Sequence, residues 1–334
     1  MVHAGVNSHP LCFRLTILLH CLGDTAGVTP HIGQKDTSVL TLDATALVEI
    51  IHLPQSSSLL ATEARPCIHA EVGRYRVRLA QSLEDREAAC RLRFRVFNIE
   101  LGEGLDSSYE TGMDTDQFDL FCEHLLVEDK LEEHPARRVV GTYRMQAGET
   151  AARNLGYYSA QEFDFAPYEP LRAGVLELGR ASIDREHRTP EVLTLLWRGI
   201  AQYACGMGLR YLIGCSSLNS QDPAEGWQMY RQLGPYRVSP EFETRPAEGF
   251  ACPAEHDGRN AQQPASTTGQ TLTLDAPAQV KVPRLLRTYL ALGARIAAPP
   301  AWDRGFGTID FLTLLDLNAL TPAARNRFLA PLTT

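Results

Sequence analysis

The sequence predicts an α/β fold in which a mixed central sheet carries helices on both faces. Residues 75–79 alternate polar and apolar side chains, which is typical of a half-buried strand. Residues 209–215 form a predominantly apolar run, as a strand buried on both sides does. Residues 190–207 repeat apolar side chains at helical spacing, which predicts a helix packed on the sheet. The predicted order is strand, helix, two strands, strand, helix, strand, helix, as in layered α/β domains.

The first helix is predicted to start after Ser82, directly behind the strand at 75–79. Ser82 is a suitable N-cap, and Asp85 three residues later takes the place of the glutamate in a capping box. Apolar residues at helical spacing continue this helix to about Ile99. Residues 102–118 are acidic and contain glycine, which indicates a loop.

The middle of the chain predicts three strands, at 124–127, 138–145 and 175–183. Residues 146–173 contain two prolines and several aromatic residues, which favours a loop or a short helix. Further elements are predicted as a helix at 190–207, a strand at 209–215, helices at 224–233 and 282–297, a last strand at 307–316 and a short helix from Pro322.

The predicted domain organisation has four parts. Residues 1–72 mix Gly, Pro, Ser and His with short apolar runs and predict a poorly ordered N-terminal extension. Residues 73–238 form the core of the α/β domain. Residues 239–280 are rich in Pro, Gly, Gln, Ser and Thr, which predicts a flexible insertion. Residues 281–334 supply a helix and a strand that complete the domain.

The bulk composition excludes several classes of protein. A net charge of −8 argues against a general nucleic-acid binder. The eight cysteines form no CxxC pair and have no histidine at zinc-site spacing, so no metal site is expected. The apolar segment at 11–23 is interrupted by Arg14 and has no Lys or Arg before it, unlike a signal peptide. A cytoplasmic protein is expected.

Five short segments carry a resemblance to one group of enzymes. They are Leu92–Phe97, Asp114–Asp119, His124–Val127, Val140–Arg144 and Leu176–Arg180. Their order and spacing resemble the acyl-homoserine-lactone synthases, which carry an Arg and a Phe on the first helix, a D-x-F-D loop, an Arg on the third strand and an E-x-S-R strand. The resemblance implies the acyltransferase fold of the GNAT superfamily.

Details favour a sister family, the ornithine acyl-acyl carrier protein N-acyltransferases that make lyso-ornithine lipid. Features similar to that family span about residues 74–330 and include Gly179 in place of Ser, Gly156–Ser159 with Glu162–Asp164, Leu195–Gly199, Gly214–Ser217, Leu285–Leu290 and Pro300–Asp303. The resemblance implies transfer of a long-chain, 3-hydroxylated acyl group from acyl carrier protein to the α-amine of L-ornithine. This is the first step of ornithine lipid biosynthesis, and it implies no cofactor beyond the acyl donor.

Glu177 is the candidate base. Amide formation needs a neutral amine, and a carboxylate can take the amine proton directly or through water. Glu177 lies in an otherwise apolar strand, where desolvation raises the pKa of a carboxyl group. The alternative is a structural Glu paired with a buried Arg.

Arg180 is the second candidate catalytic residue, and its position raises a difficulty. It lies three residues after Glu177, so a regular strand would place the two side chains on opposite faces. A β-bulge at Gly179 would bring both to one side. The alternative is an arginine paired across the sheet.

Five further residues are candidates for substrate binding. Asp116 and Asp119 suit a cationic substrate, and Arg93 and Arg144 can pair with these acids. Arg144 can instead hold the carboxylate of ornithine. Phe97 is expected to form a wall of the acyl pocket. An exposed acidic loop is the alternative for the two aspartates.

A basic turn is the candidate docking site for the acyl donor. GNAT enzymes that use coenzyme A carry glycines before the helix that binds the pyrophosphate, whereas residues 184–190 contain none. Acyl carrier protein has an acidic surface and one phosphate, for which Arg185, His187, Arg188 and Arg198 are a suitable landing site. A solvated charged turn is the alternative.

Two other functions remain open from the sequence. One is an acyl-homoserine-lactone synthase; the other is a non-catalytic acyl-carrier or lipid-binding protein. Cys215 has no histidine partner nearby in the sequence, so direct attack by the amine is preferred to an acyl-enzyme. The helix at 282–297 carries arginines beside apolar residues, either for peripheral contact with the inner face of the membrane or for packing on the sheet.

Overall fold

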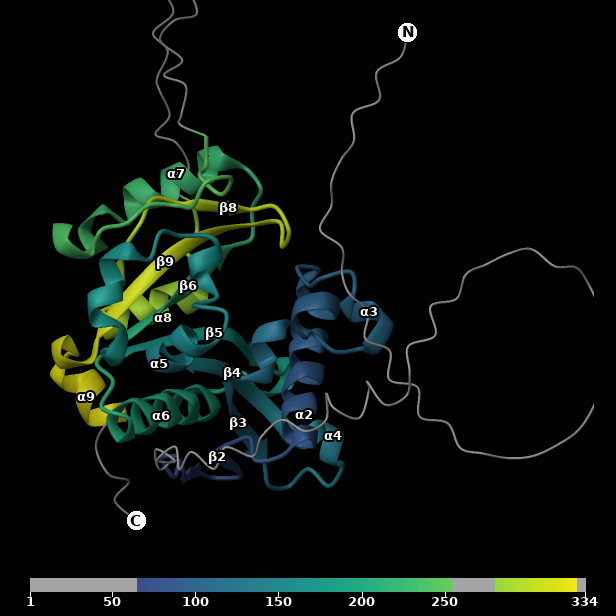
Figure 1. Ribbon diagram of the computed structural model, residues 1–334. Helices are drawn as coiled ribbons and strands as arrows, with labels where there is room; N and C mark the ends of the chain where they lie inside the picture. The colour runs from purple at the N-terminus through teal and green to yellow at the C-terminus, as the bar shows by residue number, and fades with distance from the viewer. Residues whose placement is uncertain (1–64, 254–279, 329–334) are drawn as a thin grey trace, which may run out of the picture. The chain divides into compact units, whose positions relative to one another are not determined.

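A computed structural model describes residues 65–253 and 280–328, which belong to one compact unit (Figure 1). Most of the predicted N-terminal extension and residues 254–279 of the predicted insertion lie outside the described residues. Residues 65–72 are described and belong to the fold: Ile68 is buried, and Ala70–Val72 pairs with the next strand. Residues 239–253 are also described and pack on the domain through isolated bridges at Pro246 and Ala251.

The fold is built on a nine-stranded mixed sheet, which confirms the predicted class. The order along the sheet is β1-β2-β3-β4-β5-β6-β9-β7, and β8 pairs with β9. All pairs are antiparallel except β5 with β6. The strands are β1 (Ala70–Val72), β2 (Tyr75–Leu79), β3 (Glu123–Asp129), β4 (Val139–Ala147), β5 (Val175–Ile183), β6 (Tyr211–Leu218), β7 (Arg295–Ile296), β8 (Ala301–Asp303) and β9 (Thr308–Asp316).

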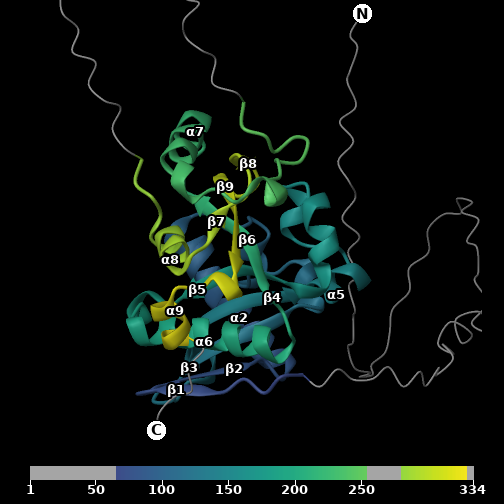
Figure 2. The same ribbon diagram turned by 90° about the vertical axis from the view of Figure 1, so that its left-hand side faces the viewer.

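Helices lie on both faces of the sheet. In Figures 1 and 2, α7 and β8 lie at one end of the molecule and β1 to β3 at the other. The helices are α2 (Leu83–Phe94), α3 (Ser108–Thr111), α4 (Pro135–Arg138), α5 (Gly148–Arg153), α6 (Pro190–Gly206), α7 (Pro223–Gln232), α8 (Arg284–Leu292) and α9 (Pro322–Phe328). A π-helical segment, Arg95–Leu101, extends α2.

Two faces of the sheet can be defined by what packs on them. On the α6 face, Leu195, Leu196 and Ile200 of α6 are fully buried against a cluster that includes Leu176 and Leu212. Burial of each such side chain contributes roughly 1.5–3 kcal/mol. The α2 face carries α2 and the segment 157–168, whose aromatic side chains pack near Val175 and Ile213. Alternation along each strand therefore assigns its side chains to one face or the other.

The start of α2 agrees with the prediction. Ser82 caps the helix by accepting a hydrogen bond from the Asp85 backbone N–H. The predicted loop at 102–118 contains the short helix α3, and the predicted helix at 282–297 is shorter, because it ends at Gly293 with φ of 111°. In the described parts of the chain, each helix is too short or too polar to cross a bilayer.

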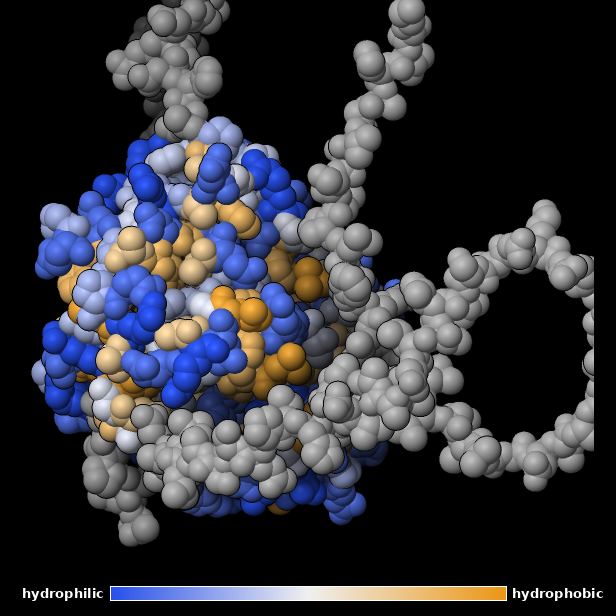
Figure 3. All heavy atoms as spheres, viewed as in Figure 1, coloured by the Kyte–Doolittle hydropathy of each residue, from blue (hydrophilic) through white to orange (hydrophobic). Residues whose placement is uncertain are grey.

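The surface is mostly hydrophilic, with hydrophobic side chains gathered in the middle of the face that Figure 3 shows. Among the exposed large hydrophobic residues are Ile99 and Leu101, at the end of the π-helical segment. Leu101 also lines the cavity described below. The C-terminal end of the π-helical segment that extends α2 thus forms part of the cavity rim.

Candidate active site

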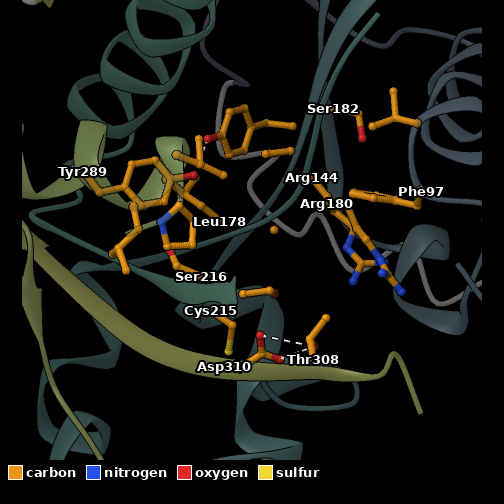
Figure 4. A pocket seen from close by; sticks show the side chains of 18 of the residues that line it. Phe97, Arg144, Leu178, Arg180, Ser182, Cys215, Ser216, Tyr289, Thr308 and Asp310 are labelled. Carbon is orange, nitrogen blue, oxygen red and sulfur yellow. Dashed lines mark hydrogen bonds between the residues drawn. The ribbon is translucent and has the colours of Figure 1, made fainter. Parts of the chain in front are cut away.

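A cavity of about 950 Å³ opens where β5 and β6 separate. The two parallel strands pair only over Val175–Glu177 and Tyr211–Ile213. Beyond this point both strands contribute cavity-lining residues, among them Leu178 and Ser216 of the α6 face and Glu177 and Cys215 of the α2 face. The cavity therefore reaches through the sheet, and Figure 4 shows its walls.

Gly214 is required at the point of separation. A Cβ atom at this position would lie 2.2 Å from the carbonyl oxygen of Leu178, which no side chain can tolerate. The backbone of Leu178 in β5 can therefore approach Gly214 in β6 closely, at the point where the two strands begin to diverge.

Glu177 lies in the cavity wall on the α2 face and is 5% exposed. Its two carboxylate oxygens accept hydrogen bonds from the backbone N–H groups of Tyr158 (2.8 Å) and Ser159 (2.7 Å). Burial raises the pKa of Glu177, although these two hydrogen bonds oppose the shift. The carboxylate thus fixes the neighbouring loop and keeps a raised affinity for a proton.

The predicted irregularity in β5 is present immediately after Gly179. Gly179 pairs with Arg144 and Ser182 pairs with Thr142, which leaves Arg180 and Ala181 opposite the single residue Tyr143. Arg180 has φ of 52° and is the only non-glycine residue with positive φ in the described chain. Such a conformation costs about 1–3 kcal/mol, so surrounding contacts must hold it. As a result, Glu177 and Arg180 line the same cavity.

Arg180 is held by aromatic rings and by the acidic loop, not by Glu177. Its guanidinium lies 4.5 Å from the ring centre of Phe306, 5.5 Å from that of Tyr158 and 5.8 Å from that of Phe97. It also lies 3.6 Å from a carboxylate oxygen of Asp116. Figure 4 shows Arg180 beside Phe97 and Arg144. These contacts stabilise a cation at the cavity wall.

An ion-pair layer supports this wall from behind. Arg93 is 1% exposed and donates hydrogen bonds to Asp114 and Asp119 at 2.7 Å each. Arg144 donates to Asp116 at 2.6 Å and to Asp119 at 3.2 Å. Burial alone would lower the pKa of Arg144, but Asp116 and Asp119 raise it, so this arginine stays charged.

The predicted site residues thus fall into three groups. Five line the cavity: Phe97, Arg144, Glu177, Arg180 and Arg188. Three form the ion-pair layer: Arg93, Asp116 and Asp119. Three lie on the turn before α6 or on α6 itself: Arg185, His187 and Arg198, of which His187 contacts the Tyr75 hydroxyl at 3.0 Å.

The structure adds three acids to which the sequence analysis assigned no role in the site. Glu162, Asp303 and Asp310, here called the acid triad, each place one carboxylate oxygen within 4.8 Å of the others. All three are buried and line the cavity. Asp310 had a signal similar to that of Glu177, an acid flanked by apolar residues in a predicted strand. Only the tertiary fold shows that it meets Glu162 and Asp303.

Two members of the acid triad, Glu162 and Asp310, have a raised pKa. Burial and repulsion from Asp310 and Asp303 raise the pKa of Glu162 well above its usual value. Burial is the main cause that raises the pKa of Asp310 to about 6. Burial and the nearby acids also raise the pKa of Cys215, so its thiol stays protonated and is a poor nucleophile.

These pKa shifts predict a pH-dependent stability. A raised pKa in the folded state means that the fold binds protons more tightly, so stability falls as the pH rises from about 4 to above 6. We expect Asp310→Asn to be more stable than the wild type at pH 8 by roughly 1–3 kcal/mol. Urea unfolding at pH 5 and pH 8 measures this, and the advantage should shrink at pH 5. Equal stability at pH 8 would contradict the prediction.

This chain is similar to several known proteins. Residues 92–198 match the family described as Acetyltransferase (GNAT) domain. Solved structures similar to this chain include TofI in a ternary complex, at 17% identity and a TM-score of 0.38 over 74% of this chain and 95% of that one. The AHL synthase LasI is 12% identical with a TM-score of 0.40, over 76% of this chain and 94% of that one.

Curated relatives are more similar in sequence. The L-ornithine N(alpha)-acyltransferase of Brucella abortus is 30% identical over 278 residues, which cover 80% of this chain and 94% of that protein. The enzyme of the same name from Agrobacterium fabrum is 31% identical over 257 residues, which cover 76% and 84%. The resemblance found in the sequence is therefore confirmed. The chain belongs to the family of L-ornithine N(alpha)-acyltransferases.

Proposed function

We propose that this protein transfers a long-chain, 3-hydroxylated acyl group from acyl carrier protein to the α-amine of L-ornithine, the first step of ornithine lipid biosynthesis. The names of its relatives support the acceptor and the reaction. The observation that carries the proposal is a buried carboxylate, Glu177, beside a cavity that passes through the sheet. The reaction needs both substrates at one point, with a proton acceptor nearby.

In this proposal the amine attacks the thioester directly. The nitrogen lone pair forms the C–N bond, the C–S bond breaks, and the second proton that the nitrogen loses goes to the departing sulfur, which leaves as the thiol of the carrier. Glu177 takes the proton that the α-ammonium must lose, directly or through one water. The protonated thiol of Cys215 supports direct attack rather than an acyl-enzyme.

The polar character of the two faces suggests which substrate enters where. On the α2 face, Arg144 and Arg180 can hold the carboxylate of the amino acid. On the α6 face, the cavity is lined by apolar side chains such as Leu178, Leu193 and Leu286. These suit the pantetheine arm and thioester of the donor. We therefore assign the acceptor to the α2 face and the donor to the α6 face.

The donor assignment agrees with the charge at the cavity rim. Arg188, Lys281 and Arg284 line the cavity and are exposed. Together with Arg185, His187 and Arg198 they form a basic surface for the acidic carrier protein and its phosphate. The outer side of α8, with Leu285 and Arg287 exposed, is suited to peripheral contact with the inner face of the membrane.

One experiment tests the reaction. The purified full chain is supplied with a 3-hydroxyacyl carrier protein thioester and either L-ornithine or S-adenosylmethionine, and the products are identified by mass spectrometry. We expect N-acyl-ornithine. An acyl-homoserine lactone from S-adenosylmethionine alone would establish a lactone synthase instead. Tight binding of the acyl carrier protein without turnover of either acceptor would establish a binding protein.

A matched pair of variants tests donor docking. Arg188 forms two hydrogen bonds with Glu100, and Arg74 forms two with Asp129; both arginines are partly exposed, but only Arg188 lines the cavity. We expect Arg188→Ala to raise the KM for the carrier thioester by roughly 3- to 10-fold, more at low salt. Arg74→Ala should leave it unchanged. Steady-state kinetics at two salt concentrations measure this, and equal KM values for both variants would contradict the docking site.

A further inference from the structure

Three carboxylates converge in the cavity from separate parts of the chain. Glu162 follows the short helix at 159–161, Asp303 ends β8, and Asp310 lies in β9. Their exposed fractions are only 3%, 8% and 4%. One oxygen of Asp303 accepts hydrogen bonds from the backbone N–H groups of Gly305 and Phe306, which fixes its position at the turn between the strands.

The cations in the same cavity wall are held by other acids. Arg144 pairs with Asp116 and Asp119, and Arg180 lies against Asp114 and Asp116. The acid triad therefore adds three carboxylates to the α2 face. They are separate from the aspartates that pair with Arg144 and Arg180. Burial raises the pKa values of Glu162 and Asp310, and repulsion from the neighbouring acids adds to the shift. A bound cation would relieve this repulsion.

A second, independent observation points to a hydrogen-bond donor in the same cavity. Gln146, directly opposite Glu177 in the sheet, lines the cavity and is 2% exposed. Its Nε2 donates to the carbonyl oxygen of Gly156 at 3.0 Å, which fixes the amide orientation. Its Oε1 is buried without a hydrogen-bond partner among the described residues. A buried acceptor without a donor is costly unless a ligand supplies one.

We propose that the acid triad binds the side-chain ammonium of the acceptor amino acid and so selects a diamino acid over a neutral one. This inference rests on the proposed function and adds the residues that determine its substrate. The amino-acid carboxylate lies at Arg144 and Arg180, the α-amine lies near Glu177 and Gln146, and the side-chain ammonium lies among Glu162, Asp303 and Asp310.

The chemistry fits an alkylammonium group. An ammonium offers three donors, one for each carboxylate, and its charge compensates the buried negative charge. Three carboxylates also suit a divalent cation. Hydrophobic residues beside the triad favour the amine, because Leu312, two residues after Asp310 on the same face of β9, and Phe163, next to Glu162, are both buried. The metal is retained as an outcome of the test.

The test compares L-ornithine with L-norvaline, which has the same carbon chain without the side-chain amine. We expect the wild type to prefer ornithine by roughly 10³-fold or more in kcat/KM, because a site built for a polar group rejects the analogue that lacks it. Asp310→Asn and Glu162→Gln should each reduce that preference by roughly 100-fold or more, mainly by raising the KM for ornithine. Activity with norvaline should stay the same or rise.

Asp316→Asn is the matched control, since Asp316 lies on the same strand but pairs with Arg210 outside the cavity. It should keep the wild-type preference. Binding is measured separately, without donor: ornithine should raise the Tm of the wild type and not that of Asp310→Asn. This second readout distinguishes failure of the inference from failure of the proposed reaction.

Two results would overturn the inference. One is an unchanged ornithine-to-norvaline ratio, together with an unchanged ornithine-induced Tm shift, in both triad variants. The other is loss of ornithine acylation on adding EDTA with recovery on adding Mg²⁺ or Ca²⁺, which would assign the triad to a metal ion. Absence of N-acyl-ornithine with the wild type would overturn the proposed function, and the Tm comparison would still decide whether the triad binds the amine.

Discussion

Glu177→Gln should lower kcat for ornithine acylation by about 10²- to 10⁴-fold, the contribution expected of a general base. The amide cannot take a proton from the amine. It also cannot accept both backbone N–H groups that now bind the carboxylate, from Tyr158 and Ser159, so the loop should loosen locally. Product formation by mass spectrometry and thermal unfolding measure the two effects. Folding should be retained.

The pH profile separates proton transfer from loop positioning. Burial raises the pKa of Glu177 above 4.5, so kcat/KM of the wild type should fall as the pH is lowered through that raised pKa. The residual activity of Glu177→Gln should lack this acidic limb. Glu123→Gln, on β3 and outside the cavity lining, is the control. Full activity of Glu177→Gln, or an unchanged acidic limb, would remove Glu177 from the role of base.

Arg93→Met should cause the largest loss of stability, about 3–5 kcal/mol in the free energy of unfolding. Met has a similar length and no charge, so it leaves Asp114 and Asp119 buried without their main partner. The pKa of Asp119 is now held low by Arg93, despite burial, and should rise in the variant. Urea unfolding at pH 7 measures the loss.

A second substitution tests the cause of this loss. Adding Asp119→Asn to Arg93→Met removes one of the stranded charges and should recover part of the stability. Arg91→Met, at an exposed pair with Glu87, should leave stability nearly unchanged. If the double variant is no more stable than Arg93→Met, the loss arises from packing and not from the buried charges.

Much of the scaffold could be predicted because its signals are local. The strand at 175–183 and the helix that begins at Pro190 were predicted with bounds that agree with the structure. Their apolar spacing and caps lie within a few residues of one another. The strand predicted at 209–215 is displaced to 211–218, since polar Ser216 and Ser217 are paired by β9. Cross-strand pairing of this kind leaves no local signal.

The exact position of the bulge in β5 also depends on contacts with residues distant in the sequence. Glu177 and Arg180 can serve one site only if the strand between them is irregular, and Gly179 was the predicted position of a bulge. The irregular residues are Arg180 and Ala181, because Arg180 is held in its unusual conformation by Phe306, from a turn more than 100 residues away, and by Asp116. Likewise, the acid triad joins Glu162 to Asp303 and Asp310 of the paired strands β8 and β9, more than 100 residues later in the sequence. Long-range contacts determine both features.

The passage of the cavity through the sheet has a consequence for how the two substrates are kept apart. The acid triad lies on the α2 face of the cavity, whereas the exposed residues Arg188, Lys281 and Arg284 line its rim. In the proposed arrangement, the acidic carrier protein and its phosphate are attracted to the basic rim, and the diamine is attracted to the acid triad. The proposal therefore gives the sheet a second role as a partition, because each reactant would be attracted to its own entrance and repelled from the other.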